Sequence, residues 1–452
     1  MFNVDDILKA TEGTLLKGTK DTKIKGVSID SRTIKDGDLF IAIKGDNFDG
    51  HDFIDEAIKK GASAIVAEKF FLAQRNLNHL PLIKVKDSVK ALGRIANYHR
   101  RRFDIPVIAV TGSNGKTTTK DMIAWILKER FNVLKNLGTK NNAIGVPLTL
   151  LGLNSGHNLC VLEIGTNHFG EVQYLTQITQ PSIGVVLNIG PSHLEFLKDL
   201  AGVYKEKSSL ISGLVHPKIG FVNTDDTYLK NCRRMFKDRL IFGFGIKDKA
   251  EFFASEIKLC ARHLEFKINK GHKVILNTCG YHNVYNALAA IGIARLFGLD
   301  YKIIASQLKK FDFPQGRLKF IRVNNVNFID DTYNSNPLSL EGALGALENL
   351  RVKGRKIFIM GDMLELGKNK EEFHRQAAHR ISKICDCFIS VGDLAALTAK
   401  VIKDKDLHYN GVFRCSCAGE AKHLLNNYIK PNKDDIVLVK GSRRLLLEEI
   451  LK

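Results

Sequence analysis

The chain has 452 residues, 44% of them hydrophobic and 26% charged, a composition typical of a globular protein with about two to four domains. No apolar run reaches membrane-spanning length, and the first residues lack the basic start and apolar core of a signal peptide. We therefore expect a cytoplasmic protein without membrane insertion. The net charge of +20 would attract an anionic nucleotide, but Lys and Arg are spread along the chain without a nucleic-acid-binding motif, so no nucleic-acid partner is expected.

Eight cysteines are scattered through the sequence, and four of them form two Cys-x-Cys pairs, Cys385/Cys387 and Cys415/Cys417. A zinc site is conceivable at such pairs, although the spacing differs from the usual Cys-x-x-Cys. The favoured interpretation is reduced cysteines that alternate along a strand.

Residues 1–104 are predicted to form a small α/β domain. Its elements are helices near 5–10, 53–60 and 88–102 and strands near 38–43 and 64–66, and residues 26–32 run into a turn. The loop over 44–51 is polar and bounded by glycines, so it is either a surface turn or part of a binding site. The basic helix over 88–102 is expected to lead into the next domain.

Residues 105–314 are predicted to form a doubly wound α/β domain with a mostly parallel sheet, organised around a phosphate-binding loop. An apolar β-branched strand ends in Thr111-Gly112-Ser113-Asn114-Gly115-Lys116-Thr117-Thr118, and a helical pattern follows to about residue 130. Glycines let backbone N–H groups surround phosphate oxygens, the lysine reaches the outer phosphates, and the first threonine hydroxyl suits Mg²⁺. The general motif has four residues between its glycines, whereas only two separate Gly112 from Gly115. The alternative is an ordinary strand-to-helix turn.

Further polar residues fall at strand ends, where ligands of such sheets bind. Glu163 ends an apolar strand, Asn188 ends the next, and His193 follows a Gly-Pro turn. Glu163 suits a Mg²⁺ ligand, but each residue could also be structural. Two further segments offer side-chain amides: Asn141 and Asn142 in the loop over 138–147, and Asn283 and Asn286 at the start of an alanine-rich helix.

Residues 315–452 are predicted to form a third, Rossmann-like α/β domain. A strand ends in Asp330-Asp331 and is followed by Thr332-Tyr333-Asn334-Ser335-Asn336-Pro337, and strands near 356–361 and 387–391 lead to Gly-Asp endings. A last strand and turn occupy 435–443.

Several of these motifs together resemble the Mur ligases, the ATP-dependent amide-bond enzymes of bacterial cell-wall precursor synthesis. The phosphate loop shows the shortened spacing of that family. Asp30-Ser31-Arg32, Gly37-Asp38-Leu39-Phe40 and Asp49-Gly50-His51 are similar to the UDP-binding N-terminal domain of its later-acting members. The stretches 330–337 and 361–367 resemble the member that adds a D-alanyl dipeptide.

The resemblance implies a role for each matching residue. It assigns catalysis to Lys116, Glu163, His193 and Lys207, and Mg²⁺ binding to Thr117, Glu163, His193 and a carbamylated Lys207. It assigns ATP binding to Gly112, Ser113, Asn114, Gly115, Lys116, Thr117, Thr118, Asn283, Asn286, Arg317 and Asp331. It implies substrate contacts for Ser31, Asn47, Asn141, Asn142, Tyr333, Asn334 and Asn336. Two departures are Phe196-Leu197-Lys198, where the family commonly has Phe-Gly-Ser, and Thr139, where asparagine is usual.

The resemblance also implies the reaction. The protein would be a monomeric ligase that activates the carboxylate of UDP-N-acetylmuramoyl-tripeptide as an acyl phosphate and joins it to D-alanyl-D-alanine, with ATP and Mg²⁺ as cofactors. This step belongs to peptidoglycan synthesis and therefore to cell shape and division. The related ligase that adds the third amino acid is an alternative, but its Asp-Asn-Pro motif is missing. Folylpolyglutamate synthase lacks a domain like residues 1–103, and a nucleotide-controlled switch would need an Asn-Lys-x-Asp-type motif.

Overall fold

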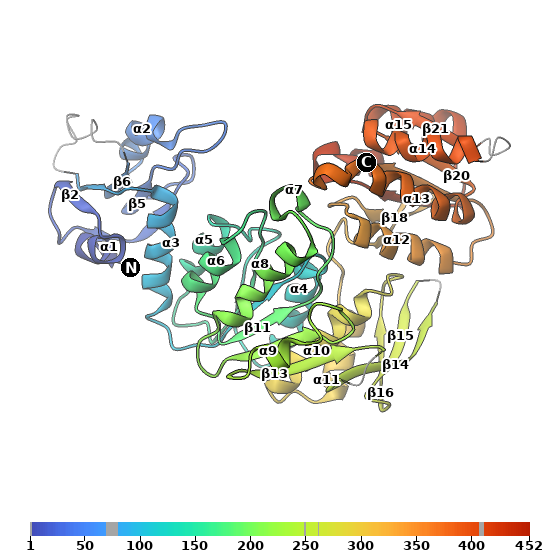
Figure 1. Ribbon diagram of the computed structural model, residues 1–452. Helices are drawn as coiled ribbons and strands as arrows, with labels where there is room; N and C mark the ends of the chain where they lie inside the picture. The colour runs from blue at the N-terminus through green and yellow to red at the C-terminus, as the bar shows by residue number, and fades with distance from the viewer. Residues whose placement is uncertain (1, 69–79, 248–249, 261, 406–410) are drawn as a thin grey trace. The chain divides into compact units, whose positions relative to one another are not determined.

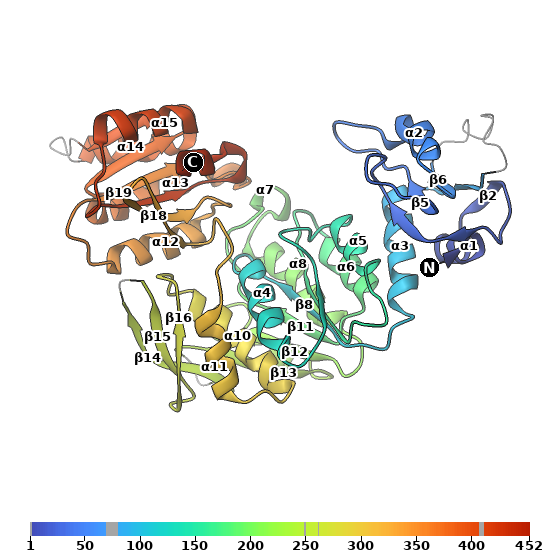
Figure 2. The ribbon, with the colours of Figure 1, turned by 180° about the vertical axis from the view of Figure 1, so that it is seen from behind.

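The computed structural model describes residues 2–68, 80–247, 250–260, 262–405 and 411–452 (Figures 1 and 2). Its chain divides into two compact units. The first unit comprises the chain up to Val107 together with Phe131–Gly165 and Gln173–Pro181. The second comprises Ile108–Arg130, Thr166–Val172 and Ser182–Lys452. Among the described residues, no helix combines the length and the apolar character needed to span a membrane.

The first unit is built on a five-stranded sheet with the order β2-β7-β6-β5-β4. Its strands are β2 (Thr14–Lys17), β4 (Gly26–Ser28), β5 (Asp38–Ile41), β6 (Ala64–Ala67) and β7 (Leu82–Lys84). Neighbours from β4 to β7 are parallel, and β2 joins β7 antiparallel. Every residue of β5 and β6 is buried, as expected for central parallel strands covered on both faces. Strands β1 (Phe2–Asn3) and β3 (Lys23–Ile24) form a separate, short antiparallel sheet.

Helix α3 (Ser88–Arg100) joins the later segments of the first unit to its N-terminal part. His99 Nε2 donates to the carbonyl of Leu153, and Asn97 and Arg100 donate to carbonyls at the end of α6 (Glu171–Thr179). The other elements of this unit are α1 (Val4–Thr11), η1 (Gly50–Phe53), α2 (Ile54–Lys59), β9 (Val133–Lys135), α5 (Gly145–Leu150) and β10 (Leu159–Glu163). The helix predicted over 53–60 begins as the 3-10 turn η1, because the Asp49 side chain caps the backbone N–H of His51.

The first sheet of the second unit holds the phosphate loop. Its strands in this unit run in the order β16-β15-β14-β13-β12-β11-β8. They are β8 (Val107–Thr111), β11 (Ile183–Val186), β12 (Ile219–Asn223), β13 (Leu240–Gly245), β14 (Phe252–Leu259), β15 (Leu264–Ile268) and β16 (His272–Leu276). The pairs from β8 to β14 are parallel as predicted, whereas β14, β15 and β16 form an antiparallel meander that the sequence analysis missed. Alternate residues of β15 are buried, which is the signature of a strand with only one covered face.

Four of the helices around this sheet lie between its strands in the sequence, namely α4 (Lys116–Leu127), α7 (Leu194–Leu197), α8 (Leu200–Ser212) and α9 (Cys232–Met235). The last two, α10 (Asn283–Leu296) and α11 (Tyr301–Lys310), follow β16. Helix α10 packs against α4, β12, β13 and β14 and is buried along nearly its whole length. It therefore provides a rigid wall next to the helix that begins at the phosphate loop.

The second sheet of this unit has the order β17-β18-β22-β19-β20-β21, parallel except for β17. Its strands are β17 (Lys319–Val323), β18 (Val326–Asp331), β19 (Lys356–Gly361), β20 (Cys387–Val391), β21 (Val412–Cys415) and β22 (Ile436–Lys440). One core cluster joins it to α12 (Pro337–Asn349), α13 (Lys370–Ile384) and α14 (Asp393–Lys405), and another joins it to α15 (Ala418–Leu424) and η6 (Leu447–Leu451) (Figure 1). The predicted fold class, α/β with mostly parallel sheets, is confirmed.

The cysteine prediction is only partly right. All eight cysteines are free thiols, but only one member of each Cys-x-Cys pair lies on a strand. Cys385 ends helix α13 and Cys417 begins helix α15. Burial raises the pKa of the Cys387 thiol to about 11, which disfavours the thiolate that zinc requires.

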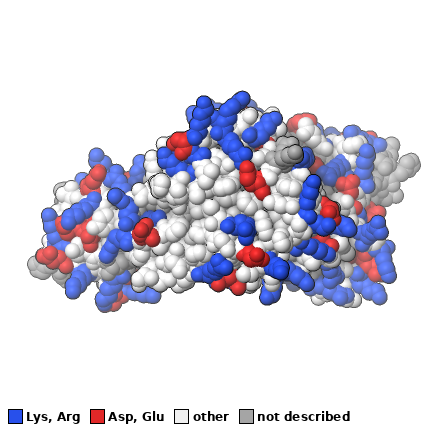
Figure 3. All heavy atoms as spheres, turned by 90° about the horizontal axis from the view of Figure 1, so that it is seen from below, with Lys and Arg blue, Asp and Glu red and all other residues white. Residues whose placement is uncertain are grey.

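Charge is mixed on the surface shown in Figure 3. Lys and Arg side chains outnumber acidic ones there, but Asp and Glu lie among them and no continuous basic band forms on this face.

Candidate active site

The phosphate loop has the strand–turn–helix geometry that its sequence predicts. Strand β8 ends at Thr111, and Gly115, with φ +85°, is the N-terminal cap of α4. A side chain at Gly115 would be strained by this φ, and its Cβ would lie 2.2 Å from the Asn286 side-chain oxygen. The Lys116 ammonium lies over the turn and donates to the carbonyls of Gly112 at 2.9 Å and Ser113 at 3.3 Å. The Lys116 ammonium therefore adds a positive charge at the helix N-terminus, whose dipole already favours the binding of an anion such as phosphate.

The turn of the phosphate loop is braced by the segment that follows β11. Ser113 donates from its backbone to the Asn188 carbonyl and from its hydroxyl to the Gly190 carbonyl. The backbone N–H of Asn114 donates to Asn188 Oδ1 at 2.8 Å, and Asn188 Nδ2 returns a hydrogen bond to the Asn114 carbonyl at 3.1 Å. Asn188, a strand-end residue of the sequence analysis, therefore fixes the backbone of the loop.

The two predicted asparagines of α10 are buried next to the phosphate loop. Asn286 donates to Asn283 Oδ1 at 2.9 Å, and Asn283 donates to the Thr278 hydroxyl at 3.2 Å. Asn286 also lies against Gly115. The structure thus brings Asn286 to the loop that the sequence assigned to ATP.

Arg317 and Asp331 are held in a second polar cluster. The Arg317 guanidinium stacks on the Tyr333 ring, with its carbon 3.9 Å from the ring centroid. Asp331 accepts from the Leu318 backbone at 3.2 Å and from the Lys440 ammonium at 2.7 Å. Lys440, buried at 1% exposure, was not predicted as a site residue. Its only sequence signal is a lysine at the end of the last apolar strand.

His282 belongs to the same cluster and was also missed. The pKa of His282 is lowered to about 4, mainly by burial; Asp331 opposes this shift, and the positive charges of Lys440 and Arg317 add to it. The imidazole is therefore neutral at physiological pH, and the cluster holds two cations against one carboxylate.

His193 contacts a carboxylate that lies 172 residues later in the chain. Its Nδ1 is 2.6 Å from Oε2 of Glu365, which follows β19. Burial lowers the pKa of His193, and the nearby ammoniums of Lys116 and Lys207 act in the same direction. A neutral imidazole whose Nδ1 donates to a carboxylate leaves Nε2 as a lone-pair donor, the usual arrangement of a metal-binding histidine.

Lys207 is buried in the middle of α8, at 1% exposure. Burial lowers the pKa of its amine well below the ordinary value, and the Lys116 charge adds to this effect while Glu206 opposes it. The neighbouring Glu206 carboxylate accepts from the Thr166 hydroxyl and from the backbone of Gly170 and Val172. Glu206, which the sequence analysis did not single out, therefore ties the 166–172 loop to the helix of Lys207.

The first unit contains Glu163 and the two loop asparagines. Asn141 Nδ2 donates to Glu163 Oε1 at 2.6 Å. The Asn136 side chain holds the Glu163 backbone: its Nδ2 donates to the Glu163 carbonyl, and its Oδ1 accepts from the Glu163 N–H. Asn142 accepts from the backbone of Ile144 and Gly145, which is a turn-capping role. The structure brings Asn141 to Glu163 and gives Asn142 structural partners.

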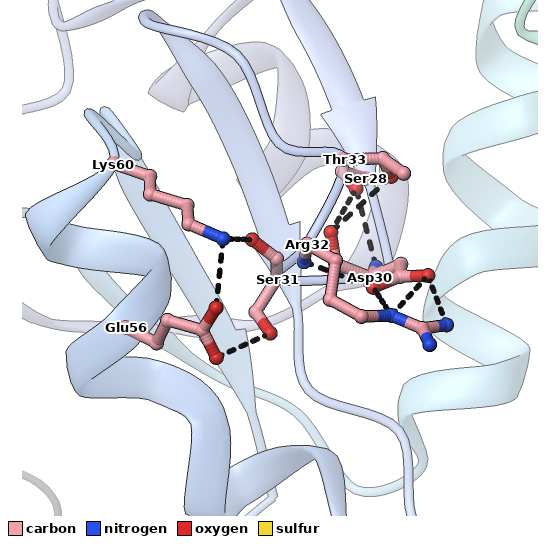
Figure 4. Close-up of polar contacts among 7 residues, drawn as sticks. All are labelled: Ser28, Asp30, Ser31, Arg32, Thr33, Glu56 and Lys60. Carbon is pink, nitrogen blue, oxygen red and sulfur yellow. Dashed lines mark hydrogen bonds and ion pairs between the residues drawn. The ribbon is translucent and has the colours of Figure 1, made fainter.

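Ser31 lies in a braced turn of the first unit, after β4 (Figure 4). Its hydroxyl donates to Glu56 at 2.9 Å, and Lys60 bridges the Ser31 carbonyl at 3.1 Å and Glu56 at 2.7 Å. The Arg32 guanidinium beside it lowers the pKa of Asp30 to about 2. Asn47 lies in the exposed loop after β5, the parallel neighbour of β4, so both predicted UDP contacts follow the same edge of the sheet.

The remaining predicted substrate residues surround the start of α12. Asn334 accepts from the backbone of Ser335 through its side chain and from Lys440 through its carbonyl. Asn336 is the N-terminal cap of α12 and also contacts Asn114. Their side chains thus have partners within the protein.

Comparison with known proteins agrees with this geometry. The sequence matches three family models: "Mur ligase family, catalytic domain" over residues 23–100, "Mur ligase middle domain" over 110–294, and "Mur ligase, glutamate ligase domain" over 316–443. A curated relative from Buchnera aphidicola, named UDP-N-acetylmuramoyl-tripeptide–D-alanyl-D-alanine ligase, is 38% identical over 95% of this chain and 92% of its own length.

Two solved structures are similar over almost the whole chain. A crystal structure of MurF from Acinetobacter baumannii has a TM-score of 0.89 and 30% identity, and covers 100% of this chain and 98% of its own. MurF from Thermotoga maritima, in complex with ADP, has a TM-score of 0.83 and 28% identity over 95% of this chain and 96% of its own.

The fold, the phosphate loop and the matches to known proteins together define an enzyme of the class that forms carbon–nitrogen bonds with ATP. The chain belongs to the Mur ligase family.

Proposed function

We propose that this protein uses ATP to join D-alanyl-D-alanine to UDP-N-acetylmuramoyl-tripeptide, releasing ADP and phosphate, as a step of peptidoglycan synthesis. The observation that carries the proposal is the phosphate loop between the C-terminal end of β8 and α4, with the Lys116 ammonium held over its turn. The full-length relatives that bear this activity in their names, and the ADP complex of one of them, support it. Because ATP and a nucleotide-linked precursor are its reactants, we place the reaction in the cytoplasm. We further propose that the enzyme acts as a monomer.

The proposal divides the work among three segments. Residues 1–104 hold the UDP portion through Ser31 and Asn47, residues 105–314 bind ATP, and residues 315–452 complete the ligase site. Asn283 and Asn286 lie on the adenine side, whereas Arg317 reaches a phosphate and Asp331 the ribose. Asn141, Asn142, Tyr333 and Asn334 face the peptide substrates directly or through the segments that they shape.

Thr117, Glu163, His193 and Lys207 are the residues that would hold Mg²⁺. Hydroxyl and carboxylate oxygens suit this hard cation, and the lone pair of a neutral His193 imidazole would complete the set. A buried lysine would join them once its amine carries a carbamate. Bound Mg²⁺ supplies charge neutralisation at the phosphates. Carbamylation converts a repelling ammonium into an anionic oxygen donor.

The proposed reaction has two chemical steps. The terminal carboxylate of the tripeptide attacks the γ-phosphorus, the bond to the β-phosphate oxygen breaks, and ADP leaves. Lys116 and Arg317 stabilise the charge on the moving phosphoryl group. The dipeptide amine then attacks the acyl carbon, and phosphate leaves from the tetrahedral intermediate as the amine loses its proton. Positioning contributes most of the acceleration, since neither reactant is activated by itself.

Phosphate release tests the proposal. We expect little release with ATP alone and rapid release once UDP-tripeptide and D-alanyl-D-alanine are both present, with a product whose mass equals the two substrates minus water. Measuring the product mass for tripeptides with lysine or diaminopimelate at the third position also identifies the substrate. Phosphate release that is independent of either substrate would contradict the ligase activity.

Replacing Glu365 should weaken Mg²⁺ binding. In Glu365→Ala, His193 loses the carboxylate 2.6 Å from its Nδ1, so its ring and tautomer are no longer fixed. We expect the Mg²⁺ concentration for half-maximal activity, and the Mn²⁺ dissociation constant measured by electron paramagnetic resonance, to rise about 10-fold or more. Glu371→Ala, on the exposed first turn of α13, is the control and should leave both unchanged. An unaltered Mn²⁺ affinity in Glu365→Ala would exclude this role.

A further inference from the structure

A reciprocal amide pair joins the phosphate loop to the start of α12. Asn336 Nδ2 donates to Asn114 Oδ1 at 2.9 Å, and Asn114 Nδ2 donates to Asn336 Oδ1 at 3.1 Å. The two residues are 222 positions apart, and both belong to the second compact unit. Asn114 occupies the turn between the two loop glycines, and Asn336 lies in the segment that follows β18.

The orientation of the Asn336 amide is fixed by its own helix. Its Oδ1 accepts from the Ser339 backbone at 2.8 Å, and the Ser339 hydroxyl accepts from the Asn336 backbone at 3.0 Å, which completes a capping box. Because Oδ1 must face the N–H groups of the first helical turn, Nδ2 is left to donate elsewhere. That donor meets Asn114 Oδ1, and this contact sets the orientation of the second amide.

Every polar group of Asn114 is occupied by a partner that fixes the turn. Its backbone N–H and carbonyl bond to Asn188 at 2.8 and 3.1 Å, and its side chain bonds twice to Asn336. The turn that presents backbone N–H groups to a phosphate is therefore held from two sides. Asn188 holds it from the segment that follows β11 of the same sheet. Asn336 holds it from the 316–443 segment, which matches a separate family model.

We propose that Asn336 is a positioning residue of the ATP site: it orients the phosphate loop through Asn114 rather than contacting either peptide substrate. The inference rests on the proposed function, since it takes ATP as the ligand of the loop. It offers Asn336 a different role from the substrate contact expected from the sequence, because both ends of its amide already have partners. It also makes nucleotide affinity depend on a segment outside the nucleotide-binding sheet.

The test separates capping from loop positioning. Serine is an equally good N-cap but is too short to span to Asn114, so Asn336→Ser retains the helix start and removes the amide pair. We expect the KM for ATP and the ADP dissociation constant, measured by calorimetry, each to rise about 10-fold, because two hydrogen bonds that hold the loop are lost. The KM values for UDP-tripeptide and D-alanyl-D-alanine should stay within about two-fold of the parent.

Two further variants complete the design. Asp300→Ser exchanges the exposed cap of α11, which has the same local role in another helix, and should not change ADP affinity. Asn114→Ala removes the pair from the other side, and the double variant with Asn336→Ser should be no weaker for ADP than Asn114→Ala alone. Additive losses in the double variant, or an unchanged ADP affinity in Asn336→Ser, would overturn the proposal, as would a rise confined to the KM for D-alanyl-D-alanine.

The same experiment keeps this proposal distinct from the proposed function. A parent enzyme that binds ADP but makes no ligated product contradicts the function alone, and the ADP affinities of the variants still decide the role of Asn336. Circular dichroism melting of each variant shows whether it is folded. If Asn336→Ser does not fold, the ADP affinity of Asn114→Ala tests the proposal instead.

Discussion

Lys116→Met should lower kcat by about 10²–10³-fold, with a smaller change in the KM values for the two peptide substrates. The Lys116 ammonium is held over the phosphate-loop turn by the carbonyls of Gly112 and Ser113. Its charge is needed most when negative charge spreads over the moving γ-phosphoryl group, so its removal raises the barrier more than it weakens ground-state binding. Steady-state phosphate release with all three substrates measures the effect.

Lys116→Arg should not restore the activity, because a planar guanidinium does not fit the position of a compact ammonium. The matched control is Lys128→Met, which removes a lysine from the opposite end of the same helix, where its ammonium lies over the Trp125 ring. We expect this control to retain nearly full kcat. A Lys116→Met enzyme with more than about a third of the parent kcat would show that the loop lysine does not stabilise the transition state.

The sequence predicted those parts of the site whose chemistry is contiguous in the chain. The phosphate loop is recognisable because the strand, the glycines, the lysine and the helix start follow each other within a few residues, and each is required by backbone geometry. The strand ends at Glu163 and Asp331 could be located because apolar runs stop there. The antiparallel meander of β14–β16 was missed because alternation in short strands is a weaker signal than the βα pattern around it.

Partners that come from distant segments could not be predicted. Glu365 beside His193, Lys440 beside Asp331 and Asn336 beside Asn114 are separated by 172, 109 and 222 residues. Each looks like an ordinary surface or strand-end residue until the sheets bring the pairs together. Nor could a single sequence show that the amides of Asn142 and Asn336 cap turns and helices, since a capping asparagine and a binding one are the same residue in the same kind of loop.

Lys207 should carry a carbamate, and Lys207→Ala should lose at least about 100-fold in kcat. A primary amine adds carbon dioxide only in its neutral form, and the product is a carbamate and a released proton. Burial in α8 and the charge of Lys116 lower the pKa of Lys207, which increases the neutral fraction of this amine relative to an ordinary lysine. After equilibration with ¹³C-bicarbonate, the protein should show one carbamate carbon by NMR that is absent from Lys207→Ala.

Lys205→Ala is the matched control for this prediction. Lys205 lies two residues earlier on the same helix but is exposed, so its side chain is hydrated and lacks the burial of Lys207. The control should keep both the ¹³C signal and nearly full activity, and activity of the parent should fall reversibly in buffer depleted of carbon dioxide. If the labelled carbon disappears from Lys205→Ala instead, or if no carbamate forms on an enzyme that is fully active, Lys207 does not supply the anionic ligand. The site must then neutralise its metal and phosphates with Glu163 and the other side chains alone, because an unmodified ammonium at Lys207 can only repel a cation.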